Sequence, residues 1–454
     1  MDLHPKRLAS RVMTSLPVHR VLPPGAIRTY AALRYLAERG DQDEVSAYLR
    51  RNGAPSSRFA ATAVVAATGA LRTGQDDVLA RILDDAEGRF PDTAELRRLR
   101  AVWLGFLGEH ERALEVARTA RMLAPASVPA AVEEVRLSYR AVDEAEADDA
   151  AVRALARFPD SAALLWAVAK ECRTAEQYER LVDVWRARAK DPSNTPVAVR
   201  QLSTAAGRAG CTEEAIAWYH QAFARLLQAG TAPAIPPPVR LHGKGAWTAI
   251  EDVAALFDAE RVPYFFAAGT VLGFVREGRP LSLDGDIDVG IRDEHFDLET
   301  LTDIFRRHPR FEFDVVHPRT KKLGLRHRGG SPVDLFRFYE EDGRLYHDGV
   351  FVRWHNSPFG VQRITVQGLE LPIPEDEERY LTENYGDWRV PNADFDAFTD
   401  DAPNVEVTWP EYRRLHHIRR AYRAFLEGDR AGAAGFLRTA DEDDLATRIE
   451  HVDG

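Results

Sequence analysis

The sequence contains very little cysteine. Cys172 and Cys211 are the two cysteines among its 454 residues. Two cysteines cannot build the disulfide framework of a small secreted domain, nor the ligand set of a cysteine-rich zinc site. Both lie in segments with a helical pattern, where cysteine serves as a small buried apolar residue. The scarcity of cysteine favours a reducing compartment.

Long apolar runs are absent as well. No run approaches the roughly 20 apolar residues that a helix needs to cross a bilayer. The first segment, MDLHPKRLASRVMTSLP, carries charges but lacks the continuous apolar core of a signal peptide. We therefore expect a cytoplasmic protein with at most peripheral membrane contact.

The second half of the chain lacks the basic residues that would balance its acidic ones. Residues 1–235 carry 32 Lys+Arg against 30 Asp+Glu, whereas residues 236–454 carry 28 against 41. A strongly acidic half argues against general nucleic-acid binding, so we expect no nucleic-acid partner. Such a half suits a protein that holds a divalent cation, or one whose charge keeps it soluble.

The first half contains an internal repeat of 34 residues. Glycine occupies four of six positions on this grid, and the residue five places after every grid position is apolar. Each unit therefore predicts a helix, a tight turn that favours glycine, and a second helix that ends at a recurring proline. The grid positions are Gly40, Gly74, Gly108, Val142, Glu176 and Gly210, followed by Val45, Leu79, Ala113, Ala147, Leu181 and Ala215.

The period and the turns LGEHERAL and AGCTEEAI resemble tetratricopeptide repeats over roughly residues 24–228. One such unit cannot bury its apolar face alone, so the units are expected to stack into an all-α solenoid. The solenoid either supports its neighbour or offers a docking surface for a protein partner or a carrier-linked substrate. The period indicates architecture and leaves this choice open.

The helical pattern ends in a proline-rich segment, QAGTAPAIPPPVRL. We predict a repeat domain at 1–228, a linker at 229–241, a second domain at 242–400 and a helical extension at 401–454. In the second domain helices alternate with strands and more strands follow, which indicates an α/β or α+β domain around a mixed sheet. The expected helices are 245–262, 270–278 and 294–308, and the expected strands are 263–269, 286–291, 311–316, 322–327, 333–339 and 344–350.

Three aspartates at every second position, Asp284, Asp286 and Asp288, open one of these strands. If the strand is regular there, the three carboxylates point the same way while Ile287 and Val289 face the core. Neighbouring carboxylates repel unless a cation lies between them, and Mg²⁺ prefers such oxygen ligands. Asp-x-Asp also occurs in solvated acidic turns, but the buried strand that follows favours a metal site.

A small-residue turn begins the helix expected before that strand. Thr270 is a candidate N-cap, and Gly269 allows a ligand to approach the backbone closely. A helix N-terminus with free N–H groups binds anions. Gly273 lies on the first turn, and Arg276 either reaches a phosphate or stays on the surface. With the carboxylates, this strand–helix–strand unit predicts a phosphoryl-transfer site.

The pattern Gly-Thr-x-Leu-Gly-x-x-Arg, followed by Asp-x-Asp-Ile-Asp, resembles the LicD/fukutin family of the nucleotidyltransferase superfamily. Two later segments, SPVDLFRFY and LELPIPEDEERYLTENYGDWRVP, resemble further motifs of that family, and the likeness covers residues 245–395. The sequence departs from the family pattern at Leu283, where tryptophan is usual, and at Gly285, which replaces an aspartate. We expect these departures to affect which substrate is bound more than the type of reaction.

The resemblance implies a nucleotidyltransferase-like α/β (α+β) domain after the solenoid, and a Mg²⁺- or Mn²⁺-dependent enzyme. It would transfer a phospho-alcohol, such as phosphocholine or a polyol phosphate, from a CDP-linked donor to a glycan hydroxyl and release CMP. Asp334 lies in an apolar strand, where a bare carboxylate is costly. The implied roles are metal binding by Asp286, Asp288 and Asp334, catalysis by Asp334 and Arg276, and phosphate binding by Gly269, Thr270 and Gly273.

Several other residues lie close to these motifs in the sequence. Lys321, Lys322 and Arg326 either meet phosphates from a neighbouring strand or lie on a solvated face. Asp284 is expected to support the metal ligands. Tyr385 and Asp387 are expected to order a loop on the acceptor side, and His355 to be structural.

Two other functions are compatible with the same residues. The superfamily shares its carboxylates with nucleotidyltransferases that move a nucleotide to a small molecule or protein. A non-catalytic repeat scaffold is the other alternative, although the intact carboxylates argue against it. The basic segment 412–430 is expected as a solvated helix or one packed on the acidic domain, with a membrane or anionic glycan as further options.

Overall fold

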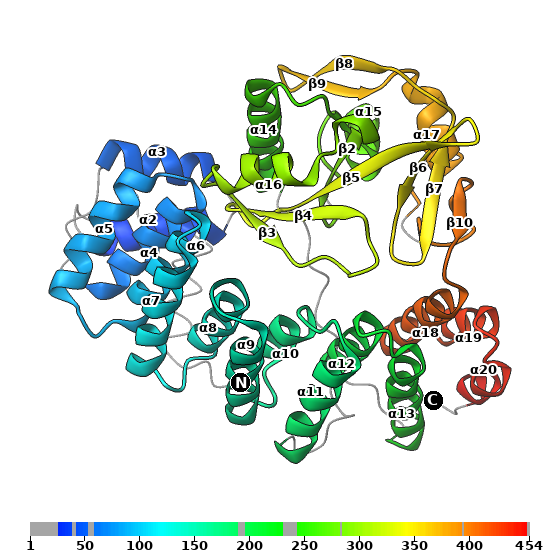
Figure 1. Ribbon diagram of the computed structural model, residues 1–454, viewed down its shortest axis with the longest axis horizontal. Coiled ribbons are helices and arrows are strands. Elements are labelled where there is room, and N and C mark those ends of the chain that lie inside the picture. Colours follow the sequence, from blue (N-terminus) through cyan, green and yellow to red (C-terminus); the bar gives the residue numbers. More distant parts are fainter. Residues whose placement is uncertain are drawn as a thin grey trace.

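The computed structural model describes residues 26–38, 42–52, 59–188, 196–229, 243–281, 284–392 and 395–451. Helices of the first half and of the C-terminus form an arc, and a sheet domain lies on its inner side (Figure 1). The predicted linker, apart from Ala229, lies outside the described residues, as does Leu283. The predicted combination of a helical region and a mixed α/β domain is confirmed.

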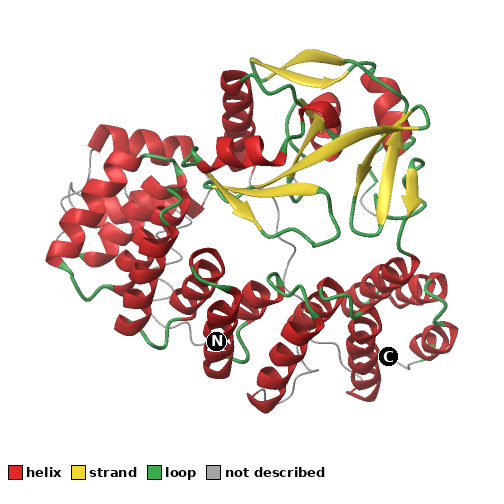
Figure 2. Cartoon of the chain, viewed as in Figure 1, coloured by secondary structure: helices red, strands yellow, loops and turns green. Residues whose placement is uncertain are grey.

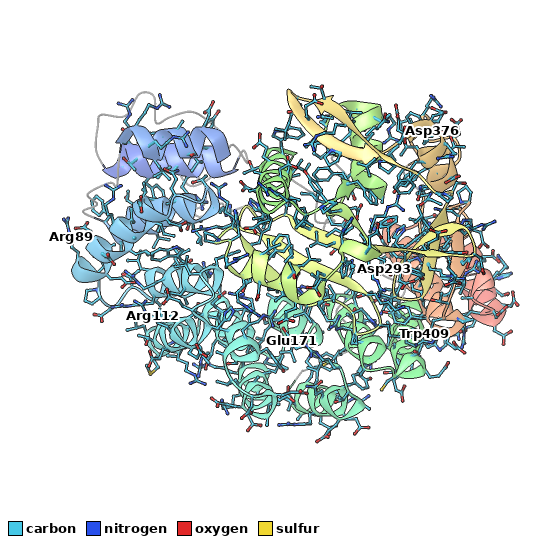
Figure 3. The ribbon with its side chains drawn as sticks, turned by 45° about the horizontal axis from the view of Figure 1, so that its top comes forward. Arg89, Arg112, Glu171, Asp293, Asp376 and Trp409 are labelled. Carbon is cyan, nitrogen blue, oxygen red and sulfur yellow. The ribbon has the colours of Figure 1, made fainter. Side chains whose placement is uncertain are left out.

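The first half consists of helices that pack as consecutive pairs. Arg89 and Arg112 lie at the outer edge of the arc, whereas Glu171 lies on its inner side (Figure 3). The helices are α2 (Ala26–Glu38), α3 (Gln42–Asn52), α4 (Ala60–Arg72), α5 (Asp76–Arg89), α6 (Ala94–Phe106), α7 (His110–Leu123), α8 (Val128–Ala141), α9 (Glu144–Arg157), α10 (Ala162–Ala169), α11 (Ala175–Arg188), α12 (Pro196–Arg208) and α13 (Thr212–Ala229).

The 34-residue grid has a structural basis. Gly74, Gly108 and Gly210 join the two helices of their pairs with φ of 68°, 75° and 82°, a left-handed conformation that glycine adopts without strain. The residue five places later is fully buried in all three units. Glu176 departs from the expectation, since it lies inside α11 rather than in a turn. Gly40 lies outside the described residues.

The second domain is built on a mixed sheet (Figure 2). Its strand order is β1-β2-β5-β6-β7-β10, and β4, which carries β3, also pairs with β5. Strands β2 and β5 run parallel, and the other pairs are antiparallel. The elements are α14 (Gly243–Glu260), β1 (Phe265–Phe266), α15 (Ala268–Glu277), β2 (Ile287–Arg292), α16 (Leu298–Arg306), β3 (Phe311–Asp314), β4 (Lys322–His327), β5 (Pro332–Glu341), β6 (Arg344–Asp348), β7 (Val352–Asn356), a separate hairpin of β8 (Val361–Val366) and β9 (Leu369–Pro374), α17 (Glu377–Tyr385) and β10 (Val405–Val407).

The core of this domain explains why the carboxylate strand is fixed in place. Val289 of β2 and Leu335 of β5 are fully buried and pair directly in the parallel ladder. Phe265 and Phe338 add an edge-to-face ring contact at 5.0 Å. Burying each such side chain contributes roughly 1.5–3 kcal/mol. The apolar residues of the strands therefore determine where the aspartates beside them lie.

The C-terminal helices continue the arc of the repeats. They are α18 (Pro410–Glu427), α19 (Arg430–Thr439) and α20 (Asp443–Glu450). Tyr422 and Phe425 of α18 pack on Tyr219 and Phe223 of α13, with ring centroids 5.3–5.8 Å apart. The same helix also packs on the acidic domain, where Tyr412 stacks on Phe351 at 5.4 Å and Arg420 pairs with Asp396. The expectation of a helix packed on the acidic domain is therefore confirmed, and that of a solvated helix is wrong. Among the described residues, no helix is long and apolar enough to cross a membrane.

Ion pairs join the arc to the sheet domain. Glu312 of β3 pairs with Arg136 of α8. Asp314, at the end of the same strand, pairs with Lys170 beside α10. These contacts fix one edge of the sheet, β3 and the loop after it, against the repeats.

Candidate functional site

A cleft of about 1440 Å³ opens along one edge of the sheet. Its walls are the helix α15, the loop between β3 and β4, the strands β5 to β7, and residues from the segments 384–392 and 395–402. No described residue before Ala268 or after Ala402 lines the cleft. The described part of the repeats therefore contacts the sheet domain without lining the cleft.

The predicted carboxylates gather on the floor of the cleft. Asp284, Asp286 and Asp288 offer oxygen atoms that all lie within 4.8 Å of one another. Asp334 of β5 is the direct register partner of Asp288 on β2. Because the two strands are parallel and adjacent, their side chains at paired positions point to the same face. The structure thus brings all four aspartates to one place.

These carboxylates lie in surroundings that oppose their ionisation. Burial raises the pKa of Asp286 to about 7, and the charges of Asp334 and Asp284 add to the effect. Burial, with repulsion from the neighbouring carboxylates, raises the pKa of Asp288 well above its usual value. Burial also raises the pKa of Asp284. A cluster of this kind is relieved by a hard divalent cation, for which carboxylate oxygens are suitable ligands. The residues present therefore fit a Mg²⁺ or Mn²⁺ ion.

The start of α15 is tied to the carboxylate strand. Thr270 is not the N-cap, which is Ala267. The buried hydroxyl of Thr270 instead accepts a hydrogen bond of 2.9 Å from the backbone N–H of Asp288. Gly269 faces Asp284, since a Cβ at this position would lie 2.5 Å from Asp284 Oδ2. Glycine and threonine are therefore needed here to let the aspartates approach the helix.

Two further residues of α15 were predicted for the site. Gly273 packs against the following loop, because a Cβ there would lie 2.7 Å from the carbonyl oxygen of Arg279. This is a packing role and does not place Gly273 against a phosphate. Arg276 lines the cleft, and its Nη1 donates a hydrogen bond of 3.2 Å to the carbonyl oxygen of Trp388.

The two predicted lysines have opposite positions. Lys322 lines the cleft and pairs with Asp334. The side chain of Lys321 is 64% exposed and approaches Asp348 at 3.4 Å, outside the cleft. Arg326 pairs with Glu312, also away from the cleft. Lys322 is the first residue of β4 whereas Lys321 precedes the strand, and only Lys322 meets the carboxylates of the cleft.

Of the remaining predicted residues, two line the cleft and one lies outside it. Tyr385 and Asp387 line the cleft. Burial raises the pKa of Tyr385 well above its usual value, and the nearby carboxylates add to the shift. His355 lies outside the cleft, with its ring 3.1 Å from Arg344 Nη1, which agrees with a structural role.

Sequence reasoning missed several residues of the cleft. Gly324 of β4 pairs with Asp334, and its missing side chain makes room for Val316, because a Cβ there would lie 2.5 Å from Val316 Cγ1. Tyr380 does not line the cleft itself but holds the start of α15, since its hydroxyl accepts a hydrogen bond of 3.0 Å from the N–H of Ala268. Phe336 of β5, His347 of β6 and Trp354 of β7 also line the cleft and form an aromatic row across these strands. Strand alternation was the available signal, but it becomes usable only once the pairing of the strands is known.

Comparison with known proteins agrees with this geometry. Residues 261–376 match the family described as LicD/FKTN/FKRP, nucleotidyltransferase domain. The chain carries a LicD-type nucleotidyltransferase domain. The resemblance predicted from the Gly-Thr and Asp-x-Asp motifs is therefore confirmed for this part of the chain.

The LicD-type domain also has curated relatives. The chain is 24% identical over 163 residues to the ribitol-5-phosphate transferase FKTN of Mus musculus, and 23% identical over the same length to that of Homo sapiens. Each match covers 33% of this chain and 34% of the relative. The chain thus spans about a third of the length of these relatives, and the helical repeats lie outside the family match.

Proposed function

We propose that the chain transfers a phospho-alcohol from a CDP-linked donor to a glycan hydroxyl and releases CMP, in a reaction that depends on Mg²⁺ or Mn²⁺. The observation that carries this proposal is the set of four aspartates on β2, β5 and the loop before β2, facing the start of α15 inside a LicD-type domain. The match and the relatives support phospho-alcohol transfer to glycans in general. The CDP donor, the metal and the predicted cytoplasmic location are our further proposals.

The chemistry follows from the positions of the side chains. The acceptor hydroxyl oxygen forms a bond to the phosphorus that carries the alcohol, and the bond from this phosphorus to the bridging oxygen of CMP breaks. CMP leaves with the electron pair of that bond. The proton of the hydroxyl passes to the carboxylate of Asp334, which Lys322 accompanies as a counter-charge. Every atom and charge is then accounted for without a further reactant.

Two other groups bind and orient the donor in this scheme. Gly269 lines the cleft at the first turn of α15, where backbone N–H groups favour phosphate oxygens. Arg276, in the last turn of the same helix, adds a positive charge. A bound divalent cation would be held by Asp284, Asp286 and Asp288 and would stabilise negative charge on the pyrophosphate.

The test is nucleotide release by the purified full-length chain. The protein is incubated with Mg²⁺, a panel of CDP-linked alcohols and a crude glycan extract, beside an Asp288→Asn variant. We expect CMP from the wild type with at least one donor and none from the variant. Pyrophosphate from a plain nucleoside triphosphate would instead establish nucleotidyl transfer. Absence of any metal-dependent turnover, together with absence of Mn²⁺ binding to the aspartates, would favour the scaffold alternative.

A further inference from the structure

Four aromatic side chains form a continuous row along the floor of the cleft. Phe336 of β5 lies 5.3 Å from His347 of β6, measured between ring centroids. His347 stacks on Trp354 of β7 at 5.0 Å, and Trp354 meets Phe398 edge-on at 5.3 Å. All four line the cleft. The row begins two residues from Asp334, on the same face of β5, and runs away from the carboxylates.

The far end of the row is held rigidly but stays accessible. The indole N–H of Trp354 donates a hydrogen bond of 2.6 Å to the carbonyl oxygen of Ala397, which ties the loop to β7. Phe398 stacks on Phe351 at 5.8 Å. Even so, Phe398 is 37% exposed, whereas Trp354 is only 8% exposed. An aromatic ring that is fixed on one side and open to a cleft on the other is suited to stacking.

Charge along the cleft separates two kinds of surface. The described residues that line the cleft include one arginine, Arg276, and one lysine, Lys322. Arg276 lies on α15 and Lys322 pairs with Asp334, so neither belongs to the β6–β7 side. That side instead carries Asp401 and Asp396, and Asp396 is paired with Arg420 and His416. A phosphate-bearing donor therefore suits the α15 side, whereas the aromatic row suits an uncharged ligand with hydroxyl groups.

The size of the cleft leaves room for such a ligand beside the donor. A site for one small molecule has a volume of roughly 300–1,000 Å³. The cleft has about 1440 Å³, which exceeds that range. Two substrates can therefore lie in it together, with the carboxylates between them.

We infer that the aromatic row is the acceptor subsite, and that Phe398 stacks on the apolar C–H face of an uncharged sugar ring of the acceptor. This inference rests on the proposed function, because it uses the carboxylates as the point of transfer. The ring next to Phe336 presents its hydroxyl to Asp334, and a ring farther along the chain lies against Phe398. The acceptor is then a neutral saccharide of at least two rings.

Saturation-transfer NMR tests the inference by measuring binding without turnover. The probes are neutral di- and trisaccharides of glucose, galactose, mannose and N-acetylhexosamine, with CMP as the donor-side probe. We expect at least one saccharide to receive saturation from the wild-type chain. In Phe398→Ala this signal should fall at least fivefold while the CMP signal is unchanged, and Phe398→Tyr, which keeps the ring, should retain it.

Two controls separate this role from loss of structure. Trp166 offers a ring that is 41% exposed on α10, outside the cleft, so Trp166→Ala should keep both signals. The unfolding midpoint of each variant reports whether it is folded. Loss of CMP binding in Phe398→Ala with retained saccharide binding would make the row a nucleobase site and overturn the inference. Failure of every saccharide to bind the wild type would overturn it as well.

Kinetics links the subsite to transfer. With a glycan acceptor and an active donor, Phe398→Ala should raise the acceptor KM about tenfold and leave the donor KM unchanged. If the wild type releases no CMP from any donor, the proposed function fails, whereas the saccharide-binding result is unaffected. The two failures are therefore distinguishable.

Discussion

Asp288 and Asp334 are register partners on two parallel strands, although 45 residues separate them in the sequence. Parallel pairing places both carboxylates on the same face of the sheet, at the floor of the cleft. Asp334 also meets Lys322 from the strand on its other side. The site is therefore assembled by three neighbouring strands, and its central member is Asp334.

The first prediction concerns this central position. Asp334→Asn removes the proposed general base while it preserves the shape of the side chain. Acceptor-dependent CMP release should fall by about 10²–10⁴-fold, the usual contribution of a general base. Binding of CMP, measured by calorimetry, should change little. A variant with near wild-type turnover would exclude Asp334 as the base.

The second prediction uses two adjacent lysines. Lys322→Gln leaves Asp334 without its counter-charge in a half-buried position, so turnover should fall at least about tenfold. Lys321→Gln is the matched control, because Lys321 is exposed outside the cleft, and its turnover should stay within about twofold of wild type. Both rates are measured under the same Mg²⁺ concentration. Equal losses in the two variants would contradict the positions that the structure gives them.

Sequence reasoning reached the local part of the site for a physical reason. Gly269, Thr270 and the Asp284–Asp288 segment lie within one strand–helix–strand unit, where spacing and alternation suffice. Whether Lys321 or Lys322 faces the carboxylates depends on the register of β4 against β5, which no local pattern contains. The same holds for the aromatic row, whose members come from separate strands.

Other misses had a signal that was available in the sequence. The segment VQRITVQGLELPIP alternates around Gln-Gly, and Gln367 and Gly368 both adopt positive φ in the turn between β8 and β9. In the basic C-terminal helix, Leu415, Ile418 and Tyr422 recur at helical spacing and are buried. This apolar stripe indicates packing on another helix.

The third prediction tests the contact between α15 and the carboxylates. In Gly269→Ala the new methyl group would overlap with Asp284 Oδ2 and displace that carboxylate. Affinity for Mn²⁺, measured by calorimetry, should fall about 10–100-fold, as is usual when the support of a metal ligand is disturbed. Gly285→Ala is the control, because a Cβ there meets no atom within 4 Å. Unchanged affinity in Gly269→Ala would remove Asp284 from the metal site.

The fourth prediction concerns the effect of the repeats on the cleft. Arg208 of α12 donates a hydrogen bond of 2.9 Å to the carbonyl oxygen of Val316, in the loop that forms one wall of the cleft. Loss of a hydrogen bond from a charged donor costs about 1.5–3 kcal/mol. Arg208→Ala should therefore lower turnover about tenfold, and Arg200→Ala, an exposed residue of the same helix, should not. If the two variants behave alike, the repeats do not position this wall.

The fifth prediction is a pH dependence at the boundary between repeats and sheet. Burial alone would raise the pKa of Glu312, but the charges of Arg136 and Arg326 outweigh it and lower this pKa to about 2. A carboxyl group whose pKa is lower in the folded state stabilises the protein above its unfolded pKa, here 4.5. That contribution is lost as the pH falls through the folded value.

Glu312→Gln isolates this contribution. Removing one partner of a buried ion pair costs about 3–5 kcal/mol, so at pH 7 the variant should unfold at a clearly lower urea concentration than the wild type. Because the wild type loses the same stabilisation as Glu312 takes up a proton, the difference between the two midpoints should shrink steadily from pH 5 toward pH 2. Glu378→Gln breaks an exposed pair with Arg389 and should shift the midpoint little at any pH. A constant difference across this range would mean that Glu312 stabilises the boundary through its shape and not through its charge.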